Sequence, residues 1–158
     1  MKKVILSTAI ILGVSFTACN NQNWSNSQTE NLKMNTMKNL ISIVEISTSD
    51  FSRAMTFYKA ILGVSIEEFE MDGTKMGILP SDGETVNVVL VKGNDYKPTA
   101  EGTVIYFNAG DDLQPTLDKI EPNGGKVIVP KTEISAEMGF FALFIDSEGN
   151  KIGLHSIH

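Results

Sequence analysis

The sequence predicts an α+β fold built from two tandem βαβββ modules. In the first half, an apolar run, a group of turn formers and a helical pattern end at Gly63, thirteen residues after Asp50. The same order returns in the second half, where Gly125 comes thirteen residues after Asp112. Three short strand-like runs separated by turn residues follow each helix. The chain therefore carries an internal duplication at the level of pattern.

The first helix is predicted over Phe51–Leu62, because apolar residues recur there at helical spacing. Asp50 stands directly before it and can accept a hydrogen bond from the free backbone N–H groups of the first turn. Gly63 follows it and can adopt the left-handed conformation in which helices commonly end. Both ends of this helix are thus defined by local chemistry.

A strand predicted over Asn39–Ile46 precedes this helix. Side chains alternate between the two faces of a strand, so Ile43 and Glu45 share one face and Val44 and Ile46 share the other. The apolar stripe of the helix needs a sheet to pack against, and we expect it to cover the face of Val44 and Ile46. Ile43 and Glu45 would then face the space that the curved sheet encloses.

The rest of the first module, about residues 39–95, is predicted as strands joined by tight turns. Asp-Gly pairs favour hairpins, because the glycine adopts positive φ without strain. The predicted strands are Val64–Met71, Thr74–Leu79 and Thr85–Lys92, and a loop over Gly93–Gly102 would connect the modules.

The second module, about residues 101–158, repeats this order. Its helix is predicted over Asp112–Ile120, with Pro115 in the first turn, where a missing N–H does no harm. The strands that follow are predicted over Lys126–Ile134, Gly139–Asp146 and Asn150–Ile157. We expect the whole of residues 39–158 to form one domain.

The N-terminus is predicted to be a signal peptide over residues 1–18. Two lysines precede an apolar run too short to span a bilayer comfortably, and the run ends directly before Cys19, the one cysteine of the chain. The four residues FTAC resemble a bacterial lipobox, although a lipobox favours Leu where Phe16 stands. The resemblance implies a diacylglycerol on Cys19. Plain secretion and an uncleaved anchor are the alternatives.

Residues 19–38 are rich in Asn, Ser and Gln and are predicted to be a disordered tether between the lipidated Cys19 and the domain. Such a chain would be bound to a membrane of the bacterial cell envelope through its N-terminal lipid, facing the periplasm or in the outer membrane. The formal net charge of −6 and the absence of a Lys/Arg cluster exclude nucleic acid as an expected partner.

The duplicated pattern, the segment SDFSRAMTFYKAILG, the segment NGGKVIVP and the closing IDSEGNKIGLHS together resemble the vicinal oxygen chelate superfamily. Glyoxalase I, bleomycin-resistance proteins and extradiol dioxygenases belong to it. The resemblance covers about residues 39–158. It implies a cup-shaped mixed sheet with the helices outside, closed either within one chain or across a homodimer.

Enzymes of that superfamily hold a divalent metal with one inward side chain from the first and last strand of each module. The corresponding positions here are Ile43, Asn87 or Val89, Val104 or Ile105, and Gly153. None of them supplies an imidazole, carboxylate or thiolate. We therefore expect no metal and no other cofactor, and no glyoxalase or dioxygenase chemistry that needs a metal.

The resemblance directs three other polar groups toward the cup: Glu45, Tyr106 and His155. Asn87 is the fourth candidate for contact with a ligand. A carboxylate and an imidazole that meet in one cavity form a plausible acid–base pair. In the alternative interpretation Glu45 is a strand-edge carboxylate, Tyr106 a half-buried core aromatic and His155 a solvated residue near a chain terminus.

The main hypothesis is a lipid-anchored protein that binds a small organic molecule in the cup without a metal. The second is a metal-free lyase or isomerase, similar to lactoylglutathione lyase in ancestry, that uses Glu45 and His155. The third is a non-catalytic interaction module of an envelope assembly. The sequence does not identify the ligand.

Overall fold

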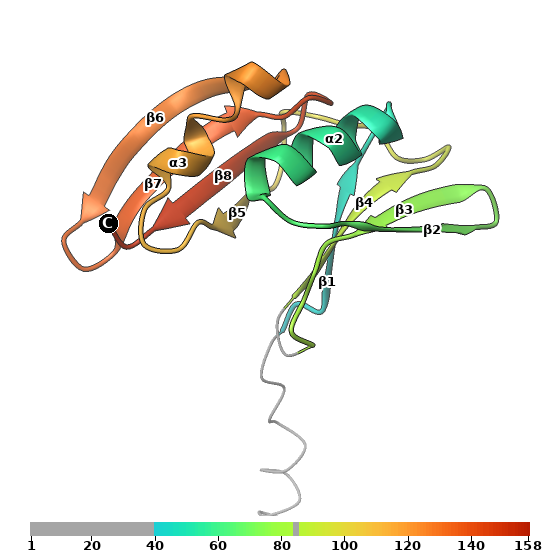
Figure 1. Ribbon diagram of the computed structural model, residues 1–158, viewed down its shortest axis with the longest axis horizontal. Helices are drawn as coiled ribbons and strands as arrows, with labels where there is room; N and C mark the ends of the chain where they lie inside the picture. Colours follow the sequence, from blue (N-terminus) through green and yellow to red (C-terminus); the bar gives the residue numbers. More distant parts are fainter. Residues whose placement is uncertain (1–39, 84–85) are drawn as a thin grey trace, which may run out of the picture. The chain divides into compact units, whose positions relative to one another are not determined.

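The computed structural model describes residues 40–83 and 86–158. The predicted signal peptide and tether lie outside these residues. Within the described residues, no helix is long and apolar enough to cross a membrane. In chain order (Figure 1), the elements are β1 (Ile43–Ser47), α2 (Phe51–Leu62), β2 (Glu67–Met71), β3 (Thr74–Ile78), β4 (Asn87–Lys92), β5 (Ile105–Asn108), α3 (Gln114–Leu117), the 3-10 helix η1 (Glu121–Asn123), β6 (Lys126–Ser135), β7 (Gly139–Ile145) and β8 (Lys151–Ser156).

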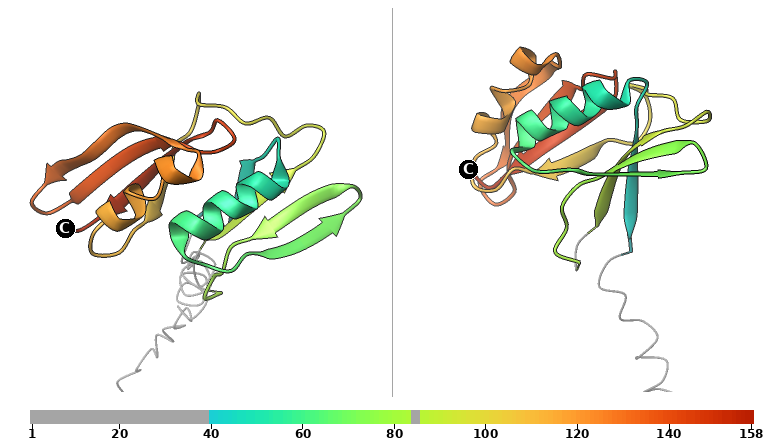
Figure 2. Two further views of the ribbon diagram at one scale, coloured as in Figure 1. Left: turned by 45° about the horizontal axis from the view of Figure 1, so that its top comes forward. Right: turned by 45° about the vertical axis from the view of Figure 1, so that its right-hand side comes forward.

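Module 1, which contains β1 to β4, is a mixed sheet with α2 on one face. Its strand order is β1-β4-β3-β2, with β1 parallel to β4 and the other pairs antiparallel. Figure 2 shows α2 lying along this sheet. Ile46 and Leu90 are opposite each other in the β1–β4 ladder, and both are buried in the core that α2 shares. The helix therefore covers the predicted face of β1.

The predicted bounds of α2 are confirmed, because its two ends depend on local groups. The Asp50 side chain accepts a hydrogen bond of 3.1 Å from the backbone N–H of Arg53. At the other end Gly63 adopts φ 68°, and its N–H donates to the carbonyl of Lys59 at 3.0 Å. The helix buries the apolar stripe Phe51, Ala54, Met55, Phe57, Tyr58 and Ile61.

Module 2, which contains β5 to β8, repeats the mixed sheet. Its strand order is β5-β8-β7-β6, again with the first pair parallel and the others antiparallel. The α+β class and the two βαβββ modules predicted from the sequence are confirmed. β6, at the outer edge, has three register shifts along its pairing with β7.

The predicted helix of module 2 was wrong in length. α3 contains only Gln114–Leu117, with Pro115 in its first turn as expected. The next residues continue with hydrogen bonds three residues apart, from Lys119 N–H to the Thr116 carbonyl at 3.1 Å and from Ile120 N–H to the Leu117 carbonyl at 3.1 Å. Such bonds tighten the chain into 3-10 geometry, which does not extend into a long helix.

Strand bounds differ from the predictions where a pairing partner is missing. β1 begins at Ile43, not at Asn39, because its parallel partner β4 begins at Asn87. Similarly, β2 begins at Glu67 and pairs over five residues with β3. Apolar alternation extends further along the sequence than the ladders that satisfy the backbone.

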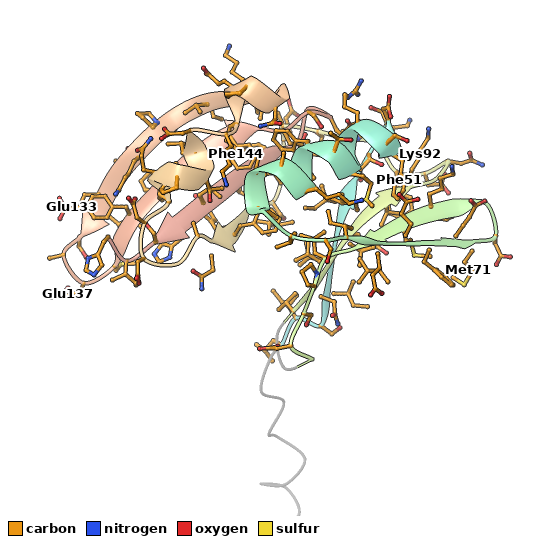
Figure 3. All side chains as sticks on the ribbon, in the orientation of Figure 1. Phe51, Met71, Lys92, Glu133, Glu137 and Phe144 are labelled. Carbon is orange, nitrogen blue, oxygen red and sulfur yellow. The ribbon has the colours of Figure 1, made fainter. Side chains whose placement is uncertain are left out.

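The two modules share one core. The ring centroids of Phe57, on α2, and Phe144, on β7, are 6.2 Å apart, and those of Tyr58 and Phe107 are 6.0 Å apart. Figure 3 shows Phe144 on the side of its sheet that carries the helices. α2 is thus packed against both sheets, which fixes module 2 to the helix of module 1.

The turn between β7 and β8 adds a polar connection between the modules. Asp146 is buried, and its carboxylate accepts four hydrogen bonds. One comes from the hydroxyl of Tyr58 on α2 at 2.7 Å. The others come from the backbone N–H groups of Glu148 and Asn150 and from the Asn150 side chain, at 2.8 to 2.9 Å. The pKa of Tyr58 is well above its usual value, mainly because the hydroxyl is buried and to a smaller extent because the Asp146 carboxylate is next to it.

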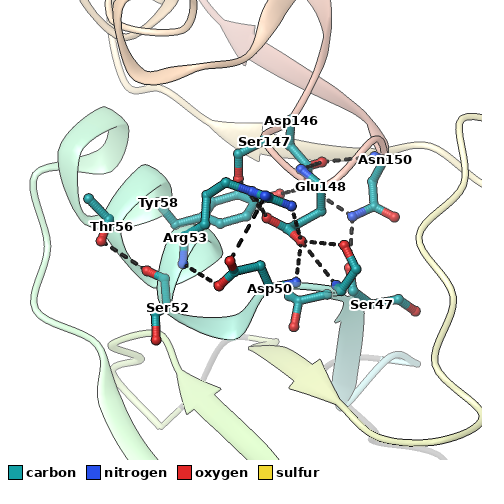
Figure 4. Close-up of polar contacts among 12 residues, drawn as sticks. Ser47, Asp50, Ser52, Arg53, Thr56, Tyr58, Asp146, Ser147, Glu148 and Asn150 are labelled. Carbon is teal, nitrogen blue, oxygen red and sulfur yellow. Dashed lines mark hydrogen bonds and ion pairs between the residues drawn. The ribbon is translucent and has the colours of Figure 1, made fainter.

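Glu148, in the same turn, caps α2 from the other module (Figure 4). Its carboxylate accepts from the backbone N–H groups of Ser49 and Asp50 at 3.0 and 2.7 Å. It also pairs with the Arg53 guanidinium, with Nε 2.8 Å from Oε1. Its side chain is 0% exposed. Burial alone would raise the pKa of Glu148, but hydrogen bonds from Arg53, Asp50 and Ser49 outweigh it and lower the pKa to about 2.

Candidate functional site

The face of the module 2 sheet that lies opposite the helices carries the candidate site. Along β8, Ile152 and Leu154 are buried in the core, so the alternating residues Gly153 and His155 belong to the open face. The register places Tyr106 of β5 beside Gly153 and Phe141 of β7 beside His155. Strand alternation and pairing register together bring an imidazole, a phenol and an aromatic ring to one face.

A cavity of about 370 Å³ opens on this face, lined by Tyr106, Ile134, Phe141 and His155. Each of these residues comes from a different strand of the sheet. Its walls are largely carbon, and its polar groups are the tyrosine hydroxyl and the imidazole. This is the composition of many small-molecule sites, in which apolar walls surround a few polar groups.

Tyr106 lies over Gly153. A Cβ atom built on Gly153 would be 2.7 Å from Cγ of Tyr106, which is shorter than real contacts of this kind. The absence of a side chain at this position of β8 thus makes room for the tyrosine ring. Tyr106 itself remains 47% exposed, with its ring available to a molecule in the cavity.

His155 is held by the turn between β6 and β7. Its Nε2 lies 2.7 Å from the carbonyl oxygen of Met138. The ring is partly buried, and Phe141 and Asn108 are its neighbours on the adjoining strands. The imidazole is therefore fixed at one nitrogen while it lines the cavity.

Glu45 does not join Tyr106 and His155, contrary to the expectation of one common cavity. Its exposed carboxylate accepts a hydrogen bond of 2.9 Å from the hydroxyl of Tyr96, and this bond raises the pKa of Tyr96. Glu45 lines another cavity, of about 180 Å³, together with Lys97 and Lys151 among others. An acid–base pair of Glu45 and His155 has no support in this arrangement.

Asn87 also lies apart from that cavity. It is partly buried at the start of β4 and lines a cavity of about 320 Å³ with Ser65, Glu67 and Ile78 among others. The four residues predicted to contact a ligand therefore lie around three different cavities. Tyr106 and His155 are the two that the structure brings together.

The residues at the superfamily's metal positions do not fit a divalent ion. Ile43 presents a hydrocarbon side chain that is 58% exposed, and Gly153 is covered by the Tyr106 ring. In residues 40–83 and 86–158 no three His, Cys, Asp or Glu side chains are grouped so that they could hold a metal. A dication needs several charged or imidazole donors, and these positions supply none.

The model of the Glyoxalase/Bleomycin resistance protein/Dioxygenase superfamily matches residues 40–154. The chain belongs to this superfamily. The match includes both modules, with β5, β6 and β7 complete and β8 as far as Leu154, one residue before His155.

Individual relatives agree with this membership. A glyoxylase-like domain-containing protein of Didymella fabae is 27% identical over 113 residues, which is 70% of this chain and 88% of that protein. A mutant of glyoxalase I from Zea mays superposes with a TM-score of 0.56 at 17% identity, over 73% of this chain and 45% of that one. The chain thus spans less than half of the maize enzyme.

The fosfomycin resistance protein FosX of Listeria monocytogenes superposes with a TM-score of 0.54 at 17% identity, over 75% of this chain and 90% of that one. At this identity the likeness to solved structures shows a shared fold.

Two lining residues, Ile134 and Phe141, were not among the predicted site residues. Alternation along β7 would have placed Phe141 on the open face, opposite the buried Ala142 and Phe144. Ile134 could not be placed in this way, because the register shifts of β6 change which of its residues face each side.

Proposed function

We propose that this protein binds a small, largely apolar organic molecule in the cavity of module 2. The observation that supports this is the cavity itself, about 370 Å³ in volume and lined by Tyr106, Ile134, Phe141 and His155. A volume of this order accommodates a small organic ligand. Two aromatic rings offer flat surfaces for stacking, and the two polar groups can orient the guest.

The proposal includes binding without the superfamily metal. At the metal positions Ile43 and Gly153 offer no donor atom, and the ring of Tyr106 fills the space beside Gly153. Addition of zinc, nickel or manganese to the purified protein is expected to leave its melting temperature unchanged. One equivalent of tightly bound metal that a chelator removes, with loss of stability, would contradict this part of the proposal.

The binding site is tested with β-naphthol, an uncharged bicyclic aromatic probe, by calorimetric titration of the purified chain. The Ile134→Trp variant, which fills the cavity, is expected to weaken binding roughly tenfold or more. Ile128→Trp is the matched control, because Ile128 lies on the same strand, is 41% exposed against 42% for Ile134, and does not line the cavity. Equal losses in the two variants, or no saturable binding at all, would refute the proposed site.

We also propose that Cys19 is lipidated and anchors the domain to a membrane of the cell envelope. The support is the sequence pattern of residues 1–19, which lie outside the described part of the chain. Growth with labelled palmitate in a bacterial host is expected to label the protein and to place it in the membrane fraction. Label that persists in Cys19→Ser would show that this cysteine is not the attachment point.

A further inference from the structure

The contact between His155 and Met138 determines which imidazole nitrogen is free. Nε2 of His155 lies 2.7 Å from the Met138 carbonyl oxygen. A carbonyl oxygen can only accept a hydrogen bond, so Nε2 must carry the proton. In a neutral imidazole the other nitrogen then has a lone pair and no hydrogen. The turn between β6 and β7 thus makes Nδ1 of His155 a hydrogen-bond acceptor.

Nδ1 is accessible to a guest. Among the described residues no hydrogen-bond partner of Nδ1 is found, and no buried side-chain nitrogen or oxygen lacks a partner. An unpartnered Nδ1 is therefore not sealed inside the protein, and His155 is one of the residues that line the cavity. The lone pair of Nδ1 is therefore open to solvent, on a residue that lines the cavity.

The charges around the cavity disfavour an anionic guest. No Lys or Arg is among the residues that line it. The hairpin that holds His155 instead carries the exposed Glu137, next to Met138 and labelled in Figure 3. An anion would meet an imidazole lone pair, without a cation among the lining residues to offset the cost of leaving water.

We infer that the cavity selects an uncharged aromatic molecule that donates a hydrogen bond, from a hydroxyl or N–H group, to Nδ1 of His155. The rings of Tyr106 and Phe141 supply the aromatic walls, and the exposed Tyr106 hydroxyl can donate to the same guest hydroxyl. This inference rests on the proposed ligand-binding function. It makes His155 the residue that determines specificity.

The test compares three probes of similar shape, namely β-naphthol, β-methoxynaphthalene and β-naphthoate, at about pH 8, where an ordinary imidazole is neutral. β-Naphthol, the donor, is expected to bind roughly three- to tenfold tighter than the methoxy compound, the effect of one hydrogen bond. β-Naphthoate should bind weakest. In His155→Phe, which keeps an aromatic wall, the preference for β-naphthol over β-methoxynaphthalene should disappear.

The possible failures are distinguishable. If none of the three probes binds, the proposed function fails; if β-methoxynaphthalene or β-naphthoate binds as tightly as β-naphthol, only the specificity inference fails. A long-range ¹H–¹⁵N correlation spectrum of the unmodified protein gives an independent readout, because protonated and unprotonated imidazole nitrogens have different shifts. A proton on Nδ1 of His155 in the neutral ring would overturn the inference even if His155→Phe does not fold.

Discussion

The two modules have the same order of strands and helices, yet they differ in what each contributes. α2 of module 1 has 12 residues and buries an apolar stripe, whereas α3 of module 2 has 4 residues and buries only Leu117. The open face of module 2 holds the aromatic cavity. The comparison shows that two modules of the same order can divide their contributions, one with the long core helix and the other with the candidate site.

The two modules also differ in how the N-termini of their helices are capped. α2 is capped by its own Asp50 and by Glu148 of the opposite module, whereas Leu113, directly before α3, makes no side-chain capping bond. Asp112 instead accepts from the Gln114 N–H and pairs with Lys131 at 2.7 Å. The internal symmetry is therefore broken at both helices, and the substitutions below test what that asymmetry contributes.

The largest effect is expected from Asp146→Ala. The change leaves the Tyr58 hydroxyl and the Asn150 donors without their acceptor in a buried turn. We expect a loss of about 3–5 kcal/mol in the free energy of unfolding, measured by urea denaturation. Tyr58→Phe removes one of the four bonds and should cost only about 1 kcal/mol. Equal losses would mean that the turn does not depend on the full set of donors.

The next largest effect is expected from Glu148→Gln, because the amide loses the charge that pairs with Arg53. We expect a loss of about 2–3 kcal/mol at neutral pH. The pKa of Glu148 is lowered from its ordinary 4.5 to about 2. A lowered folded-state pKa stabilises the protein above pH 4.5, and that stabilisation is lost as the pH falls toward 2.

The difference in stability between the wild type and Glu148→Gln should therefore shrink across that acidic range. Glu121→Gln is the control, since Glu121 is an exposed acid on module 2. It should change stability by less than about 0.5 kcal/mol at any pH. A difference between Glu148→Gln and wild type that stays constant from neutral to acidic pH would show that the carboxylate charge does not hold the modules together.

A smaller effect is expected from Gly153→Ala, which places a methyl group against the Tyr106 ring. The tyrosine must move, at a cost of about 1–2 kcal/mol, and β-naphthol binding should weaken with it. Combining Gly153→Ala with Tyr106→Ala removes the clash, so the two stability changes should not add. Additive changes would show that the ring does not occupy the space above Gly153.

The smallest effect is expected from Glu45→Gln. Glu45 is exposed, bonds to Tyr96 and lies outside the module 2 cavity. Stability should change by less than about 0.5 kcal/mol and the affinity for β-naphthol by less than about twofold. A larger loss of affinity would show that Glu45 contacts the ligand, as expected from the sequence, in a cavity shared with Tyr106 and His155.

The sequence was sufficient to predict the features that depend on neighbouring residues. Asp50 and Gly63 defined α2 because caps act within one turn. The resemblance to the superfamily directed Tyr106 and His155 toward one face, and the period of two in each strand agrees with that placement. The length of α3 could not be read in this way. The helix ends where backbone hydrogen bonds between residues four apart give way to bonds between residues three apart. Both kinds of bond occur in similar sequences.

The features that depend on distant segments were not predictable from the sequence. Glu45 has the alternation of a cup residue, but its partner Tyr96 comes from the loop between the modules. The segment IDSEGN indicated a turn between strands, yet nothing in it shows that Glu148 caps a helix 98 residues earlier. Such contacts follow from how the modules pack, and a single sequence contains no direct signal for that.

The cap on α2 has a consequence for the order of events during folding. Asp50 and Glu148 are separated by 98 positions, so closing that loop requires most of the chain to be arranged first. Until then water must satisfy the N–H groups of Ser49 and Asp50, directly before α2, while the Asp50 side chain alone caps the helix. Contacts of such long range slow folding, and we expect this bond to form in the last and slowest phase of refolding.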